Sequence, residues 1–139
     1  MIESAIRDAL YYEVGTLAGY NIDRVAWPGI EFEPVSGEIW IRPFLLPNPT
    51  ETASMGSDGL DRQNGLMQVS VFGPKGQGDS EIIMAATEVI DHFHRGADFE
   101  RDGLIVRVRQ SWRATMLEEE AWLQIPVMVD WFAHTSARG

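Results

Sequence analysis

The sequence has no cysteine in its 139 residues, so disulfide bonds, thiol nucleophiles and cysteine-ligated metal sites are excluded. Long apolar segments are missing as well, because no stretch approaches the roughly 18 apolar residues of a membrane-spanning helix. The opening segment MIESAIRDALYYEV carries Glu3 and Asp8 and does not resemble a secretory signal. We therefore expect a soluble, intracellular protein without a membrane partner.

Basic residues are scarce. Eleven Lys and Arg face twenty-one Asp and Glu, which gives a formal net charge of −10. Tight binding of nucleic acid requires a basic surface, and the only candidate is Arg107, Arg109 and Arg113, spaced along one predicted strand. A surface this acidic repels polyanions such as DNA. We expect no tight nucleic-acid binding.

Hydrophobic residues make up 45% of the chain, with five Trp and six Phe. This composition and length predict a single domain over residues 1–139 with a sizeable core. Apolar residues recur at steps of three and four in two segments, which predicts helices over 2–18 and 80–95. Alternating patterns predict strands over 37–47, 66–72, 104–112 and 122–132, and a short strand over 24–27 that ends at the Pro28–Gly29 turn.

This order of elements predicts an α+β fold, with one antiparallel or mixed sheet and two helices packed on one face. Pro43 and Pro126 fall inside predicted strands. Because proline lacks a backbone donor, we expect the strand with Pro43 at a sheet edge or with a bulge there, and we expect the missing donor of Pro126 to point outward or to an edge. The segments ADFERDG (97–103) and MLEEEAW (116–122) are predicted to be a charged turn and a connection.

Residues 48–65 are polar, with Met55 and Leu60 as almost the only apolar side chains. The segment is longer than an ordinary hairpin loop, and loops of this kind are functional or disordered. We expect it to be mobile in the isolated protein. Residues 133–139 are predicted to form a short polar tail.

The stretch GPKGQGDS joins a strand to a helix, as phosphate-binding loops do. However, Lys75 precedes Gly76 and Gly78 instead of following them, and Asp79 places a carboxylate where a phosphate would sit. The alternative is a structural corner in which the glycines adopt unusual dihedrals and Asp79 or Ser80 caps the helix. We favour the corner.

Other chemical motifs are weak. His92 and His94 are two residues apart and lie on different faces of a helix, which does not suit a metal site. DFERDG (98–103) lacks the central Gly and the bidentate Glu of a calcium loop. Glu118–Glu120 is typical of a solvated loop, and there is no G-x-S-x-G elbow. We expect no catalytic residue, cofactor or metal.

Tryptophans are numerous for this length and occur at positions 27, 40, 112, 122 and 131. Trp122 and Trp131 are nine residues apart in one predicted strand, so they lie on opposite faces of the sheet. Since helices cover only one face, this distribution suggests an apolar surface for a partner. The alternative is that all five lie in the core or at its boundary.

The order of motifs resembles that of tail terminator proteins of long-tailed bacteriophages, over about residues 2–132. VAWPG and IWIRPFLLP precede a polar loop, NGLMQVSVFGPKGQGDSEIIMAATEVIDHF follows it, and WLQIPVMVDW closes the chain. The most specific part is a G-x-x-Q-V-x-V strand followed by P-x-G-x-G, represented by Gly65, Gln68, Val69, Val71, Pro74, Gly76 and Gly78.

The resemblance implies a ring, commonly of six copies, that caps the tail tube, stops its polymerisation and offers the surface that joins the head. The implied partners are further copies of the chain, the tail tube protein and a head-completion protein. DNA passes through without tight binding. The implied location is the head-proximal end of the virion tail, after assembly in the host cytoplasm. No catalysis or cofactor is implied.

The candidate contact residues are Trp40, Arg42, Phe44, Met55, Leu60, Arg107, Arg109 and Trp122. We expect the strands 37–47 and 122–132 to be edge strands that could contribute to ring contacts. Three alternatives stay open: another neck or tail-completion protein, a small ligand-binding or hydrolytic α+β domain with an enclosed pocket, and a regulator that binds a host target.

Overall fold

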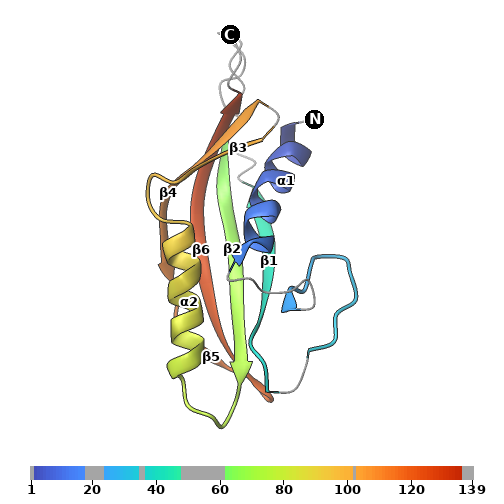
Figure 1. Cartoon of the computed structure of the whole chain (residues 1–139), viewed down its shortest axis with the longest axis vertical. Coiled ribbons are helices and arrows are strands. Elements are labelled where there is room, and N and C mark those ends of the chain that lie inside the picture. Colours follow the sequence, from blue (N-terminus) through green and yellow to red (C-terminus); the bar gives the residue numbers. More distant parts are fainter. Residues whose placement is uncertain (1, 18–23, 35–36, 48–61, 102, 136–139) are drawn as a thin grey trace.

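The computed structural model of the chain shows one twisted sheet with two helices packed on one of its faces (Figure 1). The structure describes residues 2–17, 24–34, 37–47, 62–101 and 103–135. Helix α1 spans Ile2–Gly15 and helix α2 spans Ser80–His92. Both predicted helices are therefore confirmed, and each ends three residues earlier than expected.

The sheet has six strands, with the order β1-β2-β6-β4-β3, and β5 pairs with β6 beside β4. The strands are β1 (Trp40–Pro47), β2 (Arg62–Pro74), β3 (Asp98–Arg101), β4 (Leu104–Arg113), β5 (Leu117–Glu118) and β6 (Trp122–Thr135). All neighbouring strands in this order pair antiparallel. The predicted α+β fold is confirmed.

The core lies between the sheet and the helices. Alternate residues of each strand point to this side, and both helices turn their apolar stripes toward it. Its largest fully buried side chains include Trp131, Phe93, Ile6, Leu10, Ile41, Met67, Ile125 and several valines. Helix α1 contacts β1, β3 and β4, whereas α2 contacts β2, β4 and β6. Burying each large side chain contributes about 1.5–3 kcal/mol, so this layer supplies most of the stabilisation.

Two predicted loop boundaries are wrong, because β2 and β6 are longer than their sequence patterns indicate. Residues 62–65 belong to β2, where Arg62 pairs with His134 and Gly65 with Trp131. Residues 133–135 belong to β6 and not to a polar tail. The start of β2 pairs with the end of β6, so each of these two segments supplies the hydrogen-bonding partner that the other needs to continue as a strand. The remainder of the predicted loop, with Met55 and Leu60, lies outside the described residues.

Strand β6 is central and not at an edge, so the prediction for 122–132 is wrong. The amide of Ala114 donates to the carbonyl oxygen of Pro126 at 2.8 Å. In a strand, the nitrogen and the carbonyl oxygen of one residue point to the same side. The nitrogen of Pro126, which carries no hydrogen, therefore also points toward Ala114. This position lies in the interval between the end of β4 at Arg113 and the start of β5 at Leu117. The proline consequently removes no hydrogen bond to β2.

Pro43 behaves as predicted, since β1 is an edge strand of the sheet. The amide of Ala26 donates to the carbonyl oxygen of Ile41 at 2.8 Å, on the side away from β2. Pro43 follows two residues later, so its missing donor also points away from β2. The predicted short strand at 24–27 is reduced to a single parallel bridge between Val25 and Ile41.

The charged segment 97–103 is not a simple turn. Residues Asp98–Arg101 form β3, which pairs with Leu104–Arg107 of β4. Three of the four residues of β3 are exposed, and only Phe99 packs against the core, so the strand has no apolar alternation. The expected connection 116–122 similarly contains the two-residue strand β5.

The glycine loop turns a corner, as predicted. Gly76 and Gly78 adopt φ values of +92° and +82°, which L side chains rarely tolerate. Asp79 is the N-cap residue of α2, as one of the two predicted alternatives had it, but its side chain makes no capping hydrogen bond. Gly73 permits close packing, because a Cβ there would lie 3.2 Å from Cβ of Ile82.

Within the described part of the chain, no helix is long and apolar enough to cross a membrane.

Candidate assembly surface

The face of the sheet opposite the helices, here called the open face, is covered by neither α1 nor α2. It is formed by the alternate strand residues that point away from the core. Its residues include Trp40, Arg42, Phe44, Ser70, Phe72, Arg107, Arg109, Trp112, Gln124, Met128, Asp130 and Phe132. The open face is therefore a candidate for a contact with another protein.

An aromatic cluster occupies one end of the open face. Trp40 stacks on Phe72, with ring centroids 4.0 Å apart and planes 7° from parallel. Phe32 and Trp122 pack against Trp40 at centroid distances of 5.1 and 5.7 Å. These contacts leave Trp40 only 5% exposed. Trp131 lies in the core on the other side of the sheet, which confirms the predicted separation from Trp122.

Arg42 lies over this cluster. Its guanidinium carbon is 5.4 Å from the ring centroid of Trp40 and 5.5 Å from that of Phe72, which is the geometry of a cation–π contact. The side chain is exposed. Among the described residues, no carboxylate forms an ion pair with it.

The other two arginines of the open face have acidic neighbours. Arg107 donates to both carboxylate oxygens of Asp98, with Nη2 2.8 Å from Oδ2. This bidentate contact lowers the pKa of Asp98 and raises that of Arg107. Nε of Arg109 lies 3.7 Å from Oδ1 of Asp130, and the guanidinium of Arg109 lies over the ring of Phe132.

A neutral polar site separates the two ends of the open face. The side-chain amides of Gln68 and Gln124 both donate to Oγ of Ser70, at 2.8 and 3.0 Å. Ser70 is almost fully buried, so these bonds satisfy a hydroxyl that would otherwise be costly to bury. The site is structural, and no titratable group takes part in it.

The structure brings some of the predicted contact residues together and separates others. Trp40, Arg42 and Trp122 meet in the aromatic cluster. Phe44 is half-buried two residues beyond Arg42 on the same face of β1. Arg107 and Arg109 lie on β4, on the other side of β6 from β2. Their role in assembly stays a prediction.

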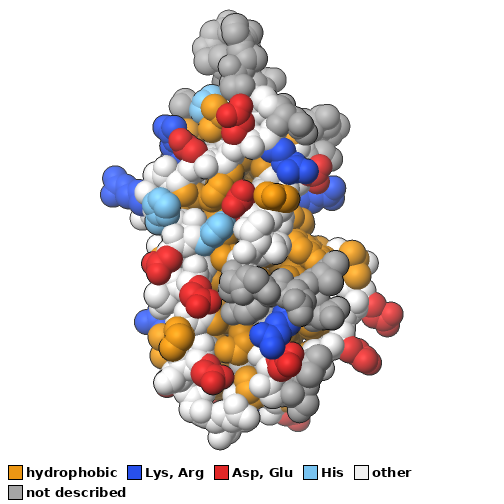
Figure 2. All heavy atoms as spheres, viewed as in Figure 1, with side chains coloured by type: hydrophobic (Ala, Val, Ile, Leu, Met, Phe, Trp, Pro, Cys, Tyr) orange, Lys and Arg blue, Asp and Glu red, His pale blue; other side chains and the backbone are white. Residues whose placement is uncertain are grey.

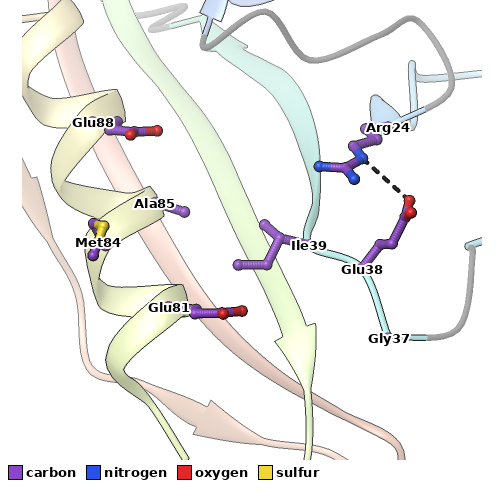
Figure 3. A pocket seen from close by; sticks show the side chains of 8 residues that line it. All are labelled: Arg24, Gly37, Glu38, Ile39, Glu81, Met84, Ala85 and Glu88. Atoms are coloured by element: carbon purple, nitrogen blue, oxygen red, sulfur yellow. Dashed lines mark hydrogen bonds and ion pairs between the residues drawn. The ribbon is translucent and has the colours of Figure 1, made fainter. Parts of the chain in front are cut away.

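A groove between α2 and residues 37–39, on the helix side of the sheet, was not predicted from the sequence. It has a volume of about 400 Å³ and is lined by Arg24, Gly37, Glu38, Ile39, Glu81, Met84, Ala85 and Glu88. Figure 3 shows Glu81, Ala85 and Glu88 pointing from α2 toward Ile39. On the opposite wall, Nε of Arg24 lies 3.2 Å from Oε1 of Glu38.

The histidines already have partners within the chain. Nε2 of His92 lies 2.9 Å from Oε1 of Glu13, and Nδ1 of His94 lies 3.0 Å from the carbonyl oxygen of Asp91. In the described ranges, no three His, Cys, Asp or Glu side chains are grouped as metal ligands.

Comparison with known sequences decides the family. The profile described as "Phage tail terminator protein" matches residues 5–131, which is nearly the whole chain. The chain belongs to the phage tail terminator family. The predicted resemblance is thereby confirmed, and the protein is a phage tail component of a structural family that is not known for enzymatic activity.

Comparison with solved structures supports the fold. One of them superposes with a TM-score of 0.76 and 22% sequence identity, covering 99% of this chain and 97% of the other chain. At this identity the similarity shows a shared fold alone. No curated protein sequence matches the terminator.

Proposed function

We propose that this terminator assembles into a ring that caps the tail tube, ends its polymerisation and provides the surface to which the head is joined. The observation that carries the proposal is the family match over residues 5–131. The open face supports it, because no described helix covers that side of the sheet.

A closed ring requires that two different surfaces of one chain fit each other. The two sides of the sheet differ strongly here. The open face presents half-buried Phe44, Met128 and Phe132 and the 40% exposed Trp112. The helix side presents acidic side chains over α2 beside a hydrophobic strip (Figure 2). This asymmetry favours a head-to-tail contact over a symmetric dimer.

The sheet edges favour a closed assembly over a fibre. The proline of β1 removes a donor from the outer edge of that strand, and the segment at Val25 and Ala26 covers part of the same edge. At the other edge, β3 has only four residues and carries Asp98, Glu100 and Arg101. Short, charged or proline-containing edges discourage uncontrolled strand pairing.

The net charge of −10 suits a ring through which DNA passes. Acidic side chains at the lumen repel phosphates and prevent trapping of the genome. In this proposal, one rim contacts the tail tube protein and the other contacts a head-completion protein. A ring of six copies at the head-proximal end of the tail, formed in the host cytoplasm, follows the family resemblance.

The experiment combines light scattering of the purified terminator with negative-stain electron microscopy, alone and with tail tubes. We expect ring-shaped particles with a central opening that bind one end of each tube. A chain that stays monomeric at every concentration, and in the presence of tubes, would contradict the proposal. Binding to capsid portals but not to tubes would instead place the protein elsewhere in the neck.

A further inference from the structure

We propose that the groove between α2 and residues 37–39 receives Arg42 from the neighbouring copy in the ring. The occupant is thus a second copy of this chain, and the contact is an arginine inserted between acidic side chains. This inference rests on the ring assembly proposed above and assigns the residues of its contact.

The groove has the chemistry of an arginine site. Ile39, Met84 and Ala85 provide apolar surface for the aliphatic part of a side chain, and Met84 is 61% exposed in the isolated chain. Glu81 and Glu88 are seven residues apart, about 10 Å along the helix, and both point into the groove (Figure 3). Among the described residues, neither carboxylate has an ion-pair partner.

The basic side of the groove is already neutralised. Arg24 is held at 3.2 Å by Glu38 on the opposite wall, so these two charges largely cancel. The remaining charge of the groove is that of Glu81 and Glu88 on α2. A guanidinium from outside the chain can therefore pair with one of these carboxylates and is attracted by the other.

Arg42 is the cation on the open face best suited to enter. Arg107 and Arg109 have acidic partners in their own chain, Asp98 and Asp130. The guanidinium of Arg42 lies instead over the rings of Trp40 and Phe72, and the side chain is exposed, so its N–H groups can still donate to a carboxylate of another copy. Arginine is favoured at such contacts because its planar guanidinium is weakly hydrated and donates in several directions.

The positions of the two elements fit a head-to-tail contact. Arg42 points to the open face, whereas Glu81 and Glu88 point into a groove on the helix side. A contact between them joins opposite sides of successive copies, and its repetition around a rotation axis closes a ring. The half-buried Phe44 on the same face of β1 would then meet the apolar parts of the next copy.

The test uses two charge-reversed variants, Arg42→Glu and the double variant Glu81→Lys/Glu88→Lys. All three side chains are exposed, so both variants should stay folded, and the unfolding midpoint should fall only slightly with the loss of the ring contacts of Arg42 and of the acidic residue Glu81 in the first turn of α2. Each variant alone should require at least about tenfold more protein than wild type to form rings, measured by analytical ultracentrifugation. The control variants Asp91→Lys and Arg95→Glu change exposed charges outside the groove and should assemble normally.

Mixing the two variants in equal amounts gives the decisive result. In an alternating ring, the glutamates introduced at position 42 would enter the basic grooves of the double variant. The unchanged Arg42 of the double variant would enter the acidic grooves of the other, so every contact is complementary and we expect the mixture to regain rings.

Two outcomes would overturn the Arg42 contact: normal rings in either variant alone, or a mixture of two folded variants that stays monomeric. Absence of rings in the wild type would instead overturn the ring proposal, and this inference with it.

Discussion

Nε2 of His92 lies 2.9 Å from Oε1 of Glu13, and this contact joins the C-terminal parts of α2 and α1. The imidazole also stacks on Phe99 of β3, with ring centroids 5.9 Å apart and planes 9° from parallel. One side chain thereby connects both helices to an edge strand. The position is half-buried, so the contact is less screened by water than one on the surface.

Replacing His92 should weaken the attachment of both helices. We expect His92→Ala to lower the free energy of unfolding by about 1–2 kcal/mol, because it removes the contact to Glu13 and the ring contacts to Phe93 and Phe99. Urea denaturation measures the change. The matched control is His94→Ala, an exposed residue two positions on, which should cost less than about 0.5 kcal/mol. Equal losses in the two variants would contradict this role.

Close packing of β2 against α2 predicts a sensitive glycine. Gly73→Ala places a Cβ 3.2 Å from that of Ile82, so a buried contact must yield, and we expect a loss of about 1–3 kcal/mol. Gly15→Ala is the comparison, because its Cβ would only touch Trp27 at 3.9 Å and alanine favours the helix. The second variant should be neutral or more stable in thermal unfolding. A tolerated Gly73→Ala would show that the helix can move away from the strand.

The pair of Arg107 and Asp98 predicts a dependence on pH. Arg107 lowers the pKa of Asp98 in the folded protein, so the pair contributes stability above the ordinary carboxylate pKa of about 4. That contribution is lost as the pH falls through the lowered pKa of the folded state. Arg107→Gln should raise the pKa of Asp98, as followed by the carboxyl carbon in an NMR titration. An unchanged titration would contradict the contact.

The proline of the edge strand predicts a difference in aggregation. Pro43→Val restores an amide that points away from β2, and therefore offers a new donor to another chain. We expect faster growth of light scattering on gentle heating, with little change in the folded spectrum. Pro34→Val, at an exposed position outside the strands, should behave as wild type. Identical scattering from both variants would show that the edge is protected by other means.

Much of the fold follows from local patterns in the sequence. The apolar alternation of β2 and the helical stripe of α2 are predictable because each buries one face against the core. Strand β3 could not be predicted, since only Phe99 of its four residues packs inward. Pro126 suggested an edge, but its nitrogen points into the interval between β4 and β5, so a proline can occupy this central strand without losing a hydrogen bond to β2.

The candidate surface was predictable only in part. The alternation of the strand places Trp40, Arg42 and Phe44 on one face, and these three residues are among the predicted contacts. The acidic groove was not, because Glu81 and Glu88 meet Ile39 only through the tertiary packing of α2 near β1. The spacing of Glu81 and Glu88 in the sequence predicts that they share one face of α2. It does not predict that residues 37–39 lie opposite that face.

The most direct test of termination adds the purified terminator to polymerising tail tube protein and measures tube lengths by electron microscopy. We expect tubes to become shorter and more uniform as terminator is added, with a ring visible at one end of each tube. Tubes whose lengths do not change at saturating terminator, and whose ends stay bare, would contradict a role in ending polymerisation.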